Sequence, residues 1–322
     1  MNEVALEARG LAKLYGGGRT LLGRARPANH AVTNVAFSLV RGETLGIVGE
    51  SGCGKSTLAR LLAGLTLPSA GTVSINGRVF GGGGNARPRV ERRSIQYVFQ
   101  DPVGSLNPRH RIHDILEAPL ARLARLDRKR RDDRLVELMD AVKLRQELLD
   151  RYPHELSGGQ AQRIGIARAL AADPDIVILD EPVSALDVSV QAEVLGLLNE
   201  LRQRLRLTYL FISHNLAVTE TFSDHVAVMY FGRIVEQAPA RQLFANPRHP
   251  YTKLLLDSAP VIGRPPKQLG VETAELPDPY APPPGCAFAA RCCNVRMRCR
   301  RETPDLTRMA ENHDVACFHP LP

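Results

Sequence analysis

GESGCGKST, residues 49–57, matches the pattern Gly-x-x-x-x-Gly-Lys-Ser/Thr in full. An apolar run, LGIVG, precedes it, and STLARLLAGL has the apolar spacing of a helix. Gly49, Gly52 and Gly54 let the backbone wrap closely around phosphate oxygens, where a Cβ atom would collide. The loop amides and the N-terminus of the helix would then face negative charge. The stretch therefore predicts a phosphate-binding loop between a strand and a helix.

Side chains of the same loop supply further contacts for a nucleotide. Lys55 places a positive charge near the β- and γ-phosphates, and Ser56 offers a hydroxyl to Mg²⁺. We expect Ser51, Cys53 and Thr57 to complete the residues that contact ATP and Mg²⁺, with Cys53 as a small filler without a redox role.

DIVILDE, residues 175–181, supplies the second half of the predicted site. Four apolar residues form a buried central strand and deliver Asp180 and Glu181 at its carboxyl end, where the ligands of α/β sheets collect. Asp180 suits the Mg²⁺ shell, and Glu181 can polarise an attacking water as a general base. Together with the glycine loop, this stretch predicts nucleotide hydrolysis.

Outward from these two motifs, strand and helix patterns alternate, which predicts an α/β fold with a largely parallel sheet covered on both faces. Residues 1–50 have strand patterns, TVSINGRVF (72–80) fits a hairpin, and the glycine-rich stretch 81–88 fits a flexible tip. From about residue 101 to 156 the patterns are helical, so a helical segment is inserted into the sheet domain. Prolines cluster after about Pro247, which predicts a linker before a small cysteine-bearing tail.

Composition limits the class of protein. Of 322 residues, 44 % are hydrophobic and 24 % are charged, which excludes a wholly disordered chain. No run reaches the roughly 18–20 apolar residues that span a bilayer, and the start, MNEVALEARG, lacks the pattern of a signal peptide. We therefore expect a cytoplasmic chain, and any membrane role must come through partners. Much of the net charge of +8 lies in residues 122–134 and 290–301. Acidic residues flank the first run, which favours a solvated helix face. No nucleic-acid-binding signature is present, so we expect no nucleic-acid partner.

LSGGQ, residues 156–160, makes the pattern specific. The order of phosphate loop, helical insert, LSGGQ, DIVILDE and a later histidine resembles the ATP-binding subunits of the ABC family. The resemblance implies an ABC-type P-loop NTPase, with a RecA-like core sheet, an antiparallel β subdomain and an inserted helical subdomain at about 101–157. It also implies that two subunits sandwich two ATP molecules between the phosphate loop of one and the signature of the other. The signature residues are Leu156, Ser157, Gly158, Gly159 and Gln160.

The same resemblance assigns four further features. Gln100 matches the glutamine that touches Mg²⁺ and the attacking water, and Tyr15 fits the aromatic residue that stacks on adenine. A lone histidine is usually structural, but His214 follows the strand after DIVILDE and so matches the switch histidine at the γ-phosphate. The implied catalytic residues are Glu181, His214 and Gln100. The loop that crosses the dimer interface is Ser184, Ala185, Leu186 and Asp187.

Three stretches narrow the branch of the family. QDPVGSLNPR (100–109), EPVSALDVSVQAEVL (181–195) and NPRHPYTKLLLDSAP (246–260) resemble ATPases of oligopeptide, dipeptide and nickel importers. GETLGIVGESGCGKSTLAR (42–60) is similar to the second ATPase of such heterodimeric systems. The resemblance implies a nucleotide-binding domain at 1–245 and a peptide-importer extension at 246–322. The implied function is to energise import of oligo- or dipeptides, with nickel or another small solute as the alternative cargo.

The resemblance also implies the partners and the location of the chain. The partners would be a second ABC ATPase subunit, either a copy or a sibling, two transmembrane permeases and, indirectly, an extracytoplasmic solute-binding protein. The chain would then lie peripherally at the cytoplasmic face of the cell membrane. A non-transport ABC ATPase of DNA repair or translation is the alternative from another class, but such proteins usually have two cassettes or a long coiled-coil insertion, and neither pattern is present here.

Five of the six cysteines fall within 32 residues of the tail. A cytosolic protein keeps its thiols reduced, so metal binding or free thiols are the two alternatives. The spacing C-x5-C-x6-C-x17-C is too wide for usual zinc fingers, and it resembles the tail of peptide-importer ATPases, some of which carry a 4Fe–4S cluster. The candidate ligands are Cys286, Cys292, Cys299 and Cys317, with Cys293 as a neighbour; the alternative is a small hydrophobic knot of reduced thiols.

Overall fold

The phosphate loop joins a buried strand, β3 (Thr44–Val48), to helix α1 (Lys55–Leu62), as the sequence predicts. The structure is a computed structural model that describes residues 3–17, 27–81, 89–258 and 276–322. The predicted flexible tip at 82–88 and most of the proline-rich linker lie outside the described residues.

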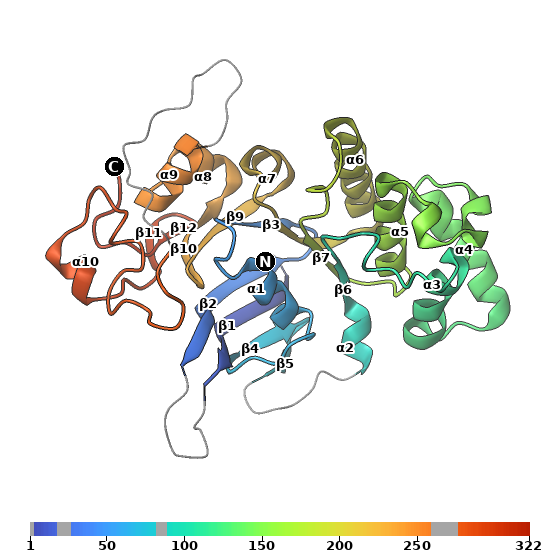
Figure 1. The fold of residues 1–322 in the computed structure, drawn as a ribbon, viewed down its shortest axis with the longest axis horizontal. Helices are drawn as coiled ribbons and strands as arrows, with labels where there is room; N and C mark the ends of the chain where they lie inside the picture. Colours follow the sequence, from blue (N-terminus) through green and yellow to red (C-terminus); the bar gives the residue numbers. More distant parts are fainter. Residues whose placement is uncertain (1–2, 18–26, 82–88, 259–275) are drawn as a thin grey trace.

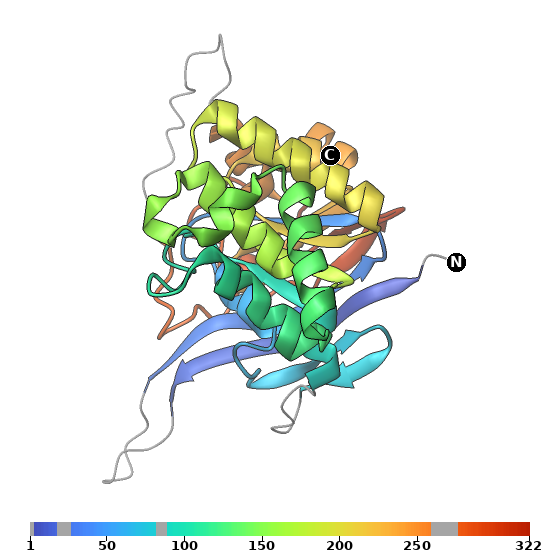
Figure 2. The ribbon, with the colours of Figure 1, turned by 90° about the vertical axis from the view of Figure 1, so that its right-hand side faces the viewer.

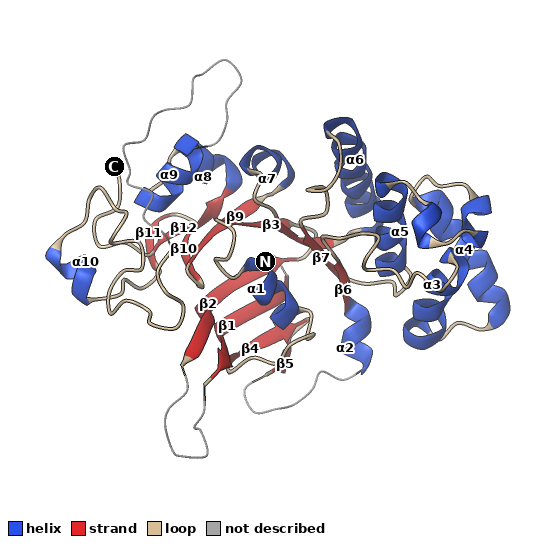
Figure 3. Ribbon diagram, in the orientation of Figure 1, coloured by secondary structure: helices blue, strands red, loops and turns tan. Residues whose placement is uncertain are grey.

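Within the described residues, the main sheet has eight strands (Figures 1 and 3). In spatial order they are β11 (Thr307–Ala310), β12 (His313–Val315), β10 (Arg233–Pro239), β9 (His225–Tyr230), β3, β8 (Thr208–Ile212), β7 (Ile176–Asp180) and β6 (Ile95–Val98). The five strands from β9 to β6 pair in parallel. β3, β7 and β8 are buried at every position, because both faces of a parallel sheet are covered.

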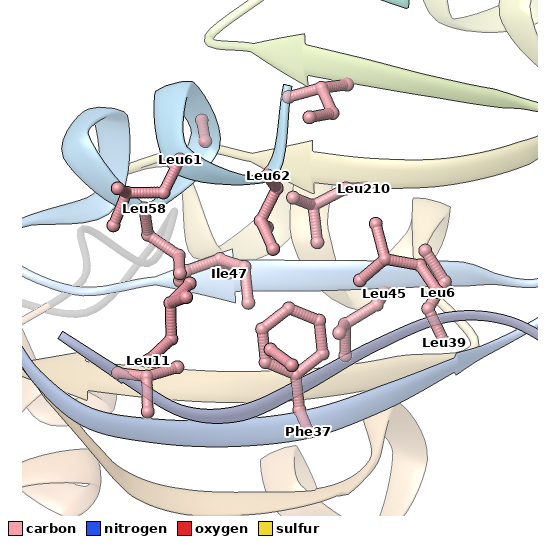
Figure 4. Close-up of a cluster of buried hydrophobic side chains, with 14 of the residues drawn as sticks. Leu6, Leu11, Phe37, Leu39, Leu45, Ile47, Leu58, Leu61, Leu62 and Leu210 are labelled. Atoms are coloured by element: carbon pink, nitrogen blue, oxygen red, sulfur yellow. The ribbon is translucent and has the colours of Figure 1, made fainter. Parts of the chain in front are cut away.

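A second, antiparallel sheet packs against α1 and β3. Its strands, in spatial order, are β2 (Ala28–Val40), β1 (Val4–Gly16), β4 (Ala70–Ile75) and β5 (Arg78–Phe80), so the predicted hairpin at 72–80 is confirmed. Figure 4 shows Leu58 and Leu62 of α1 over Ile47 of β3, with Leu11 and Phe37 on the other side. This apolar layer holds the phosphate loop between the two sheets.

Helices gather at one end of the main sheet (Figures 1 and 2). They are α2 (Arg89–Ser94), α3 (Ile112–Pro119), the π-helical η1 (Leu120–Ala124), α4 (Arg128–Ala141), the 3-10 segments η2 (Gln146–Asp150) and η3 (Pro153–Glu155), α5 (Gly158–Leu170), α6 (Val188–Leu205) and, nearer the centre, α7 (Leu216–Phe222). A second apolar core joins them to the sheet through Leu116, Leu138, Ile164, Leu197 and Leu179. LSGGQ, at the end of the helical insert, lies against the segment between β7 and α6, because a Cβ at Gly158 would lie 3.4 Å from Leu186.

The tail adds strands to the main sheet, which the sequence patterns did not predict. After α8 (Ala240–Ala245) and α9 (Pro250–Ser258), the chain returns through α10 (Met297–Arg301) to β11 and β12. β12 pairs with β10 in antiparallel fashion. The buried carboxylate of Glu236 on β10 accepts hydrogen bonds from the amides of Arg248 and His249 and contacts Nε2 of His313 at 2.7 Å. One side chain therefore ties β10, the segment before α9 and β12 together.

Candidate nucleotide-binding site

The backbone of the phosphate loop requires glycine for steric reasons. Gly49 has φ +152°, and a Cβ there would lie 2.1 Å from the carbonyl oxygen of Met229. Gly54 has φ +105°, and a Cβ there would lie 2.3 Å from the carbonyl oxygen of Ala31. Neighbouring backbone thus packs directly behind the loop, and its other side is left for phosphate oxygens.

Lys55 begins α1 directly after the loop, and its side chain is buried. Its Nζ donates hydrogen bonds to the carbonyl oxygens of Gly49 at 2.7 Å and Glu50 at 2.9 Å, with Sγ of Cys53 at 3.8 Å. The ammonium group is therefore held inside the curve of the loop, where a phosphate anion would sit. Burial raises the pKa of the Cys53 thiol, which fits an inert filler.

Ser56 and Asp180 meet where the loop faces the end of β7. Ser56 Oγ donates to Asp180 Oδ1 at 3.2 Å, and the hydroxyl of Tyr97 on β6 donates to the other carboxylate oxygen. Burial raises the pKa of Asp180, while these two hydrogen bonds oppose that shift. A hydroxyl and a carboxylate form a hard-oxygen donor pair, which is the ligand type that Mg²⁺ prefers. The residues present therefore fit a magnesium ion.

Glu181 follows Asp180 with a left-handed backbone, φ +49°. Such a conformation is costly for a non-glycine residue and persists where the surroundings enforce it, here through the Glu181 amide, which donates to the Ile212 carbonyl at 2.9 Å. Its Oε2 accepts from Nε2 of Gln100 at 3.0 Å and lies 3.1 Å from Nδ1 of His214. The structure thus brings the three residues predicted as catalytic onto one oxygen atom. The Glu181 side chain is 17 % exposed and His214 is 60 % exposed, so the group borders solvent.

LSGGQ opens α5. Ser157 is the N-cap residue, and a reciprocal pair of hydrogen bonds with Gln160 forms a capping box. Both signature glycines pack against the segment that follows β7. A Cβ at Gly158 would lie 3.4 Å from Leu186, and one at Gly159 would lie 2.7 Å from Cγ1 of Val190. A surface hollow is lined jointly by signature residues and by Ala185, Leu186 and Asp187 of the predicted dimer loop. No phosphate-loop residue lines this hollow, so the two predicted ATP contacts of one chain lie apart.

Tyr15 lies at the end of β1, in register with Asn29 of β2. The residue is 40 % exposed, and Nζ of Lys13 lies 5.1 Å from the centroid of its ring. Ala31, two residues beyond Asn29, contributes the carbonyl that backs Gly54. This places an accessible aromatic ring on the strand pair that borders the phosphate loop.

The C-terminal cysteines are free thiols. Burial raises the pKa of Cys286, Cys317 and Cys292, the last to about 11, and neighbouring thiols among the candidate set add to each shift. Across the residues that the structure describes, no group of three or more His, Cys, Asp or Glu side chains is arranged to hold a metal ion. The cysteines are therefore near one another, but their arrangement does not fit a preformed metal cage.

Three side chains at the site escaped the sequence analysis. Tyr97 donates to Asp180, the hydroxyl of Tyr251 accepts from the amide of Glu50 at 2.9 Å, and Arg291 contacts the Glu50 carboxylate. Tyr251 lies in the family-like stretch 246–260, but no pattern in the sequence indicates that it contacts the phosphate loop, and both Tyr251 and Arg291 reach the loop from the tail. Only their three-dimensional contacts identify them.

Comparisons with known proteins agree with this geometry. The family model described as "ABC transporter" matches residues 32–184, and that described as "Oligopeptide/dipeptide transporter, C-terminal region" matches residues 235–299. The dipeptide transport ATP-binding protein DppF of Haemophilus influenzae is 46 % identical over 99 % of this chain and 97 % of its own length. The oligopeptide transport ATP-binding protein AppF of Bacillus subtilis is 44 % identical over 98 % of this chain and 97 % of its own length.

Solved structures share the fold. The ATP-binding cassette MJ0796, a dimer in a post-hydrolysis state with bound ADP and Pi, has a TM-score of 0.65 and 28 % identity, covering 73 % of this chain and 99 % of that one. CbiO1 of Clostridium perfringens, part of an ABC transporter complex, has a TM-score of 0.63 and 27 % identity, covering 76 % of this chain and 91 % of that one. Within the described part of this chain, none of the helices has the length and apolarity needed to span a membrane.

Proposed function

We propose, because this chain belongs to the family of ABC transporter ATP-binding proteins, that it is the ATP-hydrolysing subunit of an importer for di- or oligopeptides. The observation that carries the hydrolytic part is the convergence of Gln100 and His214 on Oε2 of Glu181, directly beside Asp180. The similarity to peptide-transport ATPases over nearly the whole chain, tail included, carries the choice of cargo.

In this proposal, the loop amides and Lys55 bind the β- and γ-phosphates of ATP. Ser56 and Asp180 would hold Mg²⁺, which would neutralise the charge on the phosphate oxygens. Glu181 orients the attacking water and accepts its proton, because its carboxylate is fixed at the mouth of the site by two neighbours. His214 approaches the γ-phosphate from the end of β8, and Gln100 links the water to the helical insert that follows it.

The other ATP contact would come from a second ATPase subunit. The supporting observation is that the signature and Asp187 share a hollow away from the phosphate loop of the same chain. We propose a homo- or heterodimer with each ATP between the loop of one subunit and the signature of the other, and two transmembrane permeases on the helical inserts. A solute-binding protein would take part only indirectly, and the chain would lie peripherally at the cytoplasmic face of the membrane.

We also propose that the chain is divided into a nucleotide-binding domain at 1–245 and a peptide-importer extension at 246–322.

Replacing Glu181 by Gln tests this function. The amide keeps the size of the side chain but cannot accept a proton, so we expect ATP binding to persist and hydrolysis to fall by about 10²-fold or more. Glu220→Gln, on the exposed face of α7, is the matched control and should hydrolyse ATP like the native chain. Normal turnover in Glu181→Gln would remove this carboxylate from the role of base.

Uptake in cells tests the cargo. Cells carrying the native chain should take up labelled di- and oligopeptides, and cells carrying Glu181→Gln should not. Ni²⁺ uptake is measured alongside, because nickel is the alternative cargo. Loss of Ni²⁺ uptake with peptide uptake intact would keep the ATPase and change its cargo, whereas loss of neither would contradict the transport proposal.

For the C-terminal cysteines, we propose a 4Fe–4S cluster on Cys286, Cys292, Cys299 and Cys317 against the alternative of reduced thiols. The support is that the four cysteines lie within one small segment, 286–317, and that this segment resembles the tails of peptide-importer ATPases. The described arrangement is no preformed cage, so a cluster would require these thiols to rearrange and lose their protons. Protein purified without oxygen should then contain iron, sulfide and visible absorbance; their absence would leave the reduced thiols.

A further inference from the structure

Glu50 is an acidic residue inside a loop built for anions, and each of its polar groups has a partner. Its amide donates to the hydroxyl of Tyr251 at 2.9 Å, and its carbonyl oxygen accepts from Nζ of Lys55 at 2.9 Å. Its two carboxylate oxygens accept from Nη1 and Nη2 of Arg291, each at 2.8 Å. The phosphate loop is therefore fixed at Glu50 by two side chains from the C-terminal part of the chain.

Arg291 is itself held firmly. Its guanidinium carbon lies 6.0 Å from the ring centroid of Tyr230 and 5.8 Å from that of Phe288, and these two rings pack edge to face. The Arg291 side chain is only 15 % exposed and that of Glu50 is 29 % exposed, so water screens the pair weakly. A planar guanidinium that binds both carboxylate oxygens fixes the direction of the carboxylate as well as its charge.

The pair has an electrostatic consequence for nucleotide binding. A free carboxylate at position 50 would repel a triphosphate, and it would offer Lys55 a competing anionic partner next to the carbonyl that Lys55 already contacts. Arg291 cancels the charge and occupies both carboxylate oxygens. The tail also contacts β2, the strand whose Ala31 carbonyl backs Gly54 of the loop, because the carbonyl of Pro279 accepts from the amide of His30 at 3.1 Å.

We propose that Arg291 is a positioning residue for ATP: it neutralises and orients Glu50, so that the positive potential of the phosphate loop and Lys55 acts on the nucleotide alone. This inference rests on the proposed function, since it concerns the same loop. It gives the tail a part in ATP binding. Arg291 acts indirectly, through its contact with the Glu50 carboxylate. The contact joins residues 241 positions apart in the chain.

The test is a set of variants of the full chain, with ATP affinity measured by displacement of a fluorescent ATP analogue. Arg291→Met keeps much of the apolar stem and removes the charge, and it should weaken ATP binding about tenfold, the order expected when one member of a charged pair is left uncompensated. The double variant Glu50→Gln/Arg291→Met should bind ATP as tightly as Glu50→Gln alone. The deficit of Arg291→Met should also shrink as KCl is raised, because salt screens the exposed carboxylate.

Arg298→Met is the matched control. Arg298 lies in the same tail, donates to Glu302 at 2.8 Å and stacks on Phe318, but makes no contact with the loop among the described residues. It should bind ATP like the native chain. The thermal unfolding temperature of each variant shows whether the substitution also lowers the stability of the whole fold.

The outcomes separate this inference from the function on which it rests. If the native chain binds no ATP, the proposed function fails. If the native chain binds ATP and Arg291→Met, still folded, binds it equally well, the positioning role is wrong. If Arg291→Met is weak but Glu50→Gln restores nothing, Arg291 acts only as a structural clamp and the electrostatic role is overturned.

Discussion

Acid should destabilise this protein through one buried histidine. His249 has 2 % of its surface exposed, at the start of α9. Its Nδ1 accepts a hydrogen bond from the amide of Tyr251 at 3.0 Å, and the ring also bonds the backbone of Ala316. A proton on Nδ1 would face the N–H of Tyr251 instead of a lone pair, so the fold requires a neutral ring. Burial lowers the pKa of His249 from 6.5 to about 3.

The magnitude follows from proton linkage. Between pH about 6.5 and about 3, the unfolded chain binds a proton at His249 that the folded chain does not, so stability falls as the pH is lowered. Each pH unit costs about 1.4 kcal/mol, and about 1.5 units separate pH 6.5 from pH 5, which gives a loss of about 2 kcal/mol between neutral pH and pH 5. The stabilisation is fully present above pH 6.5 and disappears as the pH approaches 3. Glu236, which accepts from the amide of His249, contacts Nε2 of His313 at 2.7 Å.

Urea unfolding at pH 7.5 and pH 5 measures this loss. His249→Gln can keep the acceptor toward Tyr251 and the contact with Ala316 without a titrating ring, so its loss of stability should be smaller than the native loss by about 2 kcal/mol. His110→Gln, at an exposed surface position, should lose as much as the native chain. Equal losses for His249→Gln and the native chain would refute the assignment of a neutral buried ring.

Two further predictions concern the phosphate loop. Lys55→Ala removes the ammonium group that the Gly49 and Glu50 carbonyls hold. It should weaken ATP binding at least about tenfold and abolish ATP hydrolysis, measured as release of inorganic phosphate. Near-native hydrolysis would contradict the role of Lys55 in binding phosphate. Gly54→Ala should cost about 2 kcal/mol or more in urea unfolding, because its Cβ meets the Ala31 carbonyl at 2.3 Å. Gly77→Ala shares a positive φ, +77°, but has no atom within 4 Å of its Cβ, so it should cost less; equal losses would exclude the clash as the cause.

The fold around the site was predictable because short-range patterns determine it. A strand, a glycine loop and a helix follow one another in residues 44–62, and the apolar run before Asp180 fixes β7 in the sheet centre. The predicted α/β architecture is confirmed. The family resemblance implied the roles of Gln100 and His214 beside Glu181, and the three residues lie together because the strands that precede them are parallel, so their carboxyl ends meet at one edge.

The C-terminal contacts could not be predicted in this way. β12 is three residues long, which is too short to show the alternating hydrophobic pattern of a strand, and its register with β10 could not be predicted from the sequence. Arg291 occurs in a basic run whose simplest interpretation is a solvated surface, and its pairing depends on the aromatic rings that the fold places under it. The resemblance of the tail to peptide-importer ATPases suggested a metal centre on four cysteines, whereas the described arrangement contains no metal-binding group.

The tail and the signature act on opposite sides of the proposed nucleotide. Arg291 and Tyr251 fix the phosphate loop from behind, within one chain. The first amides of α5, from Gly158 and Gly159, have no helical carbonyl to pair with, and Ser157 caps the same turn, so this helix start is suited to bind an anion from outside the chain. Under the proposed pairing, a defect at Arg291 weakens the ATP site that contains its own loop, whereas a defect at Ser157 weakens the site of the partner. If one subunit of a dimer carries a variant at Arg291 and the other carries a variant at Ser157, both defects therefore affect the same ATP site, and the second site is left intact.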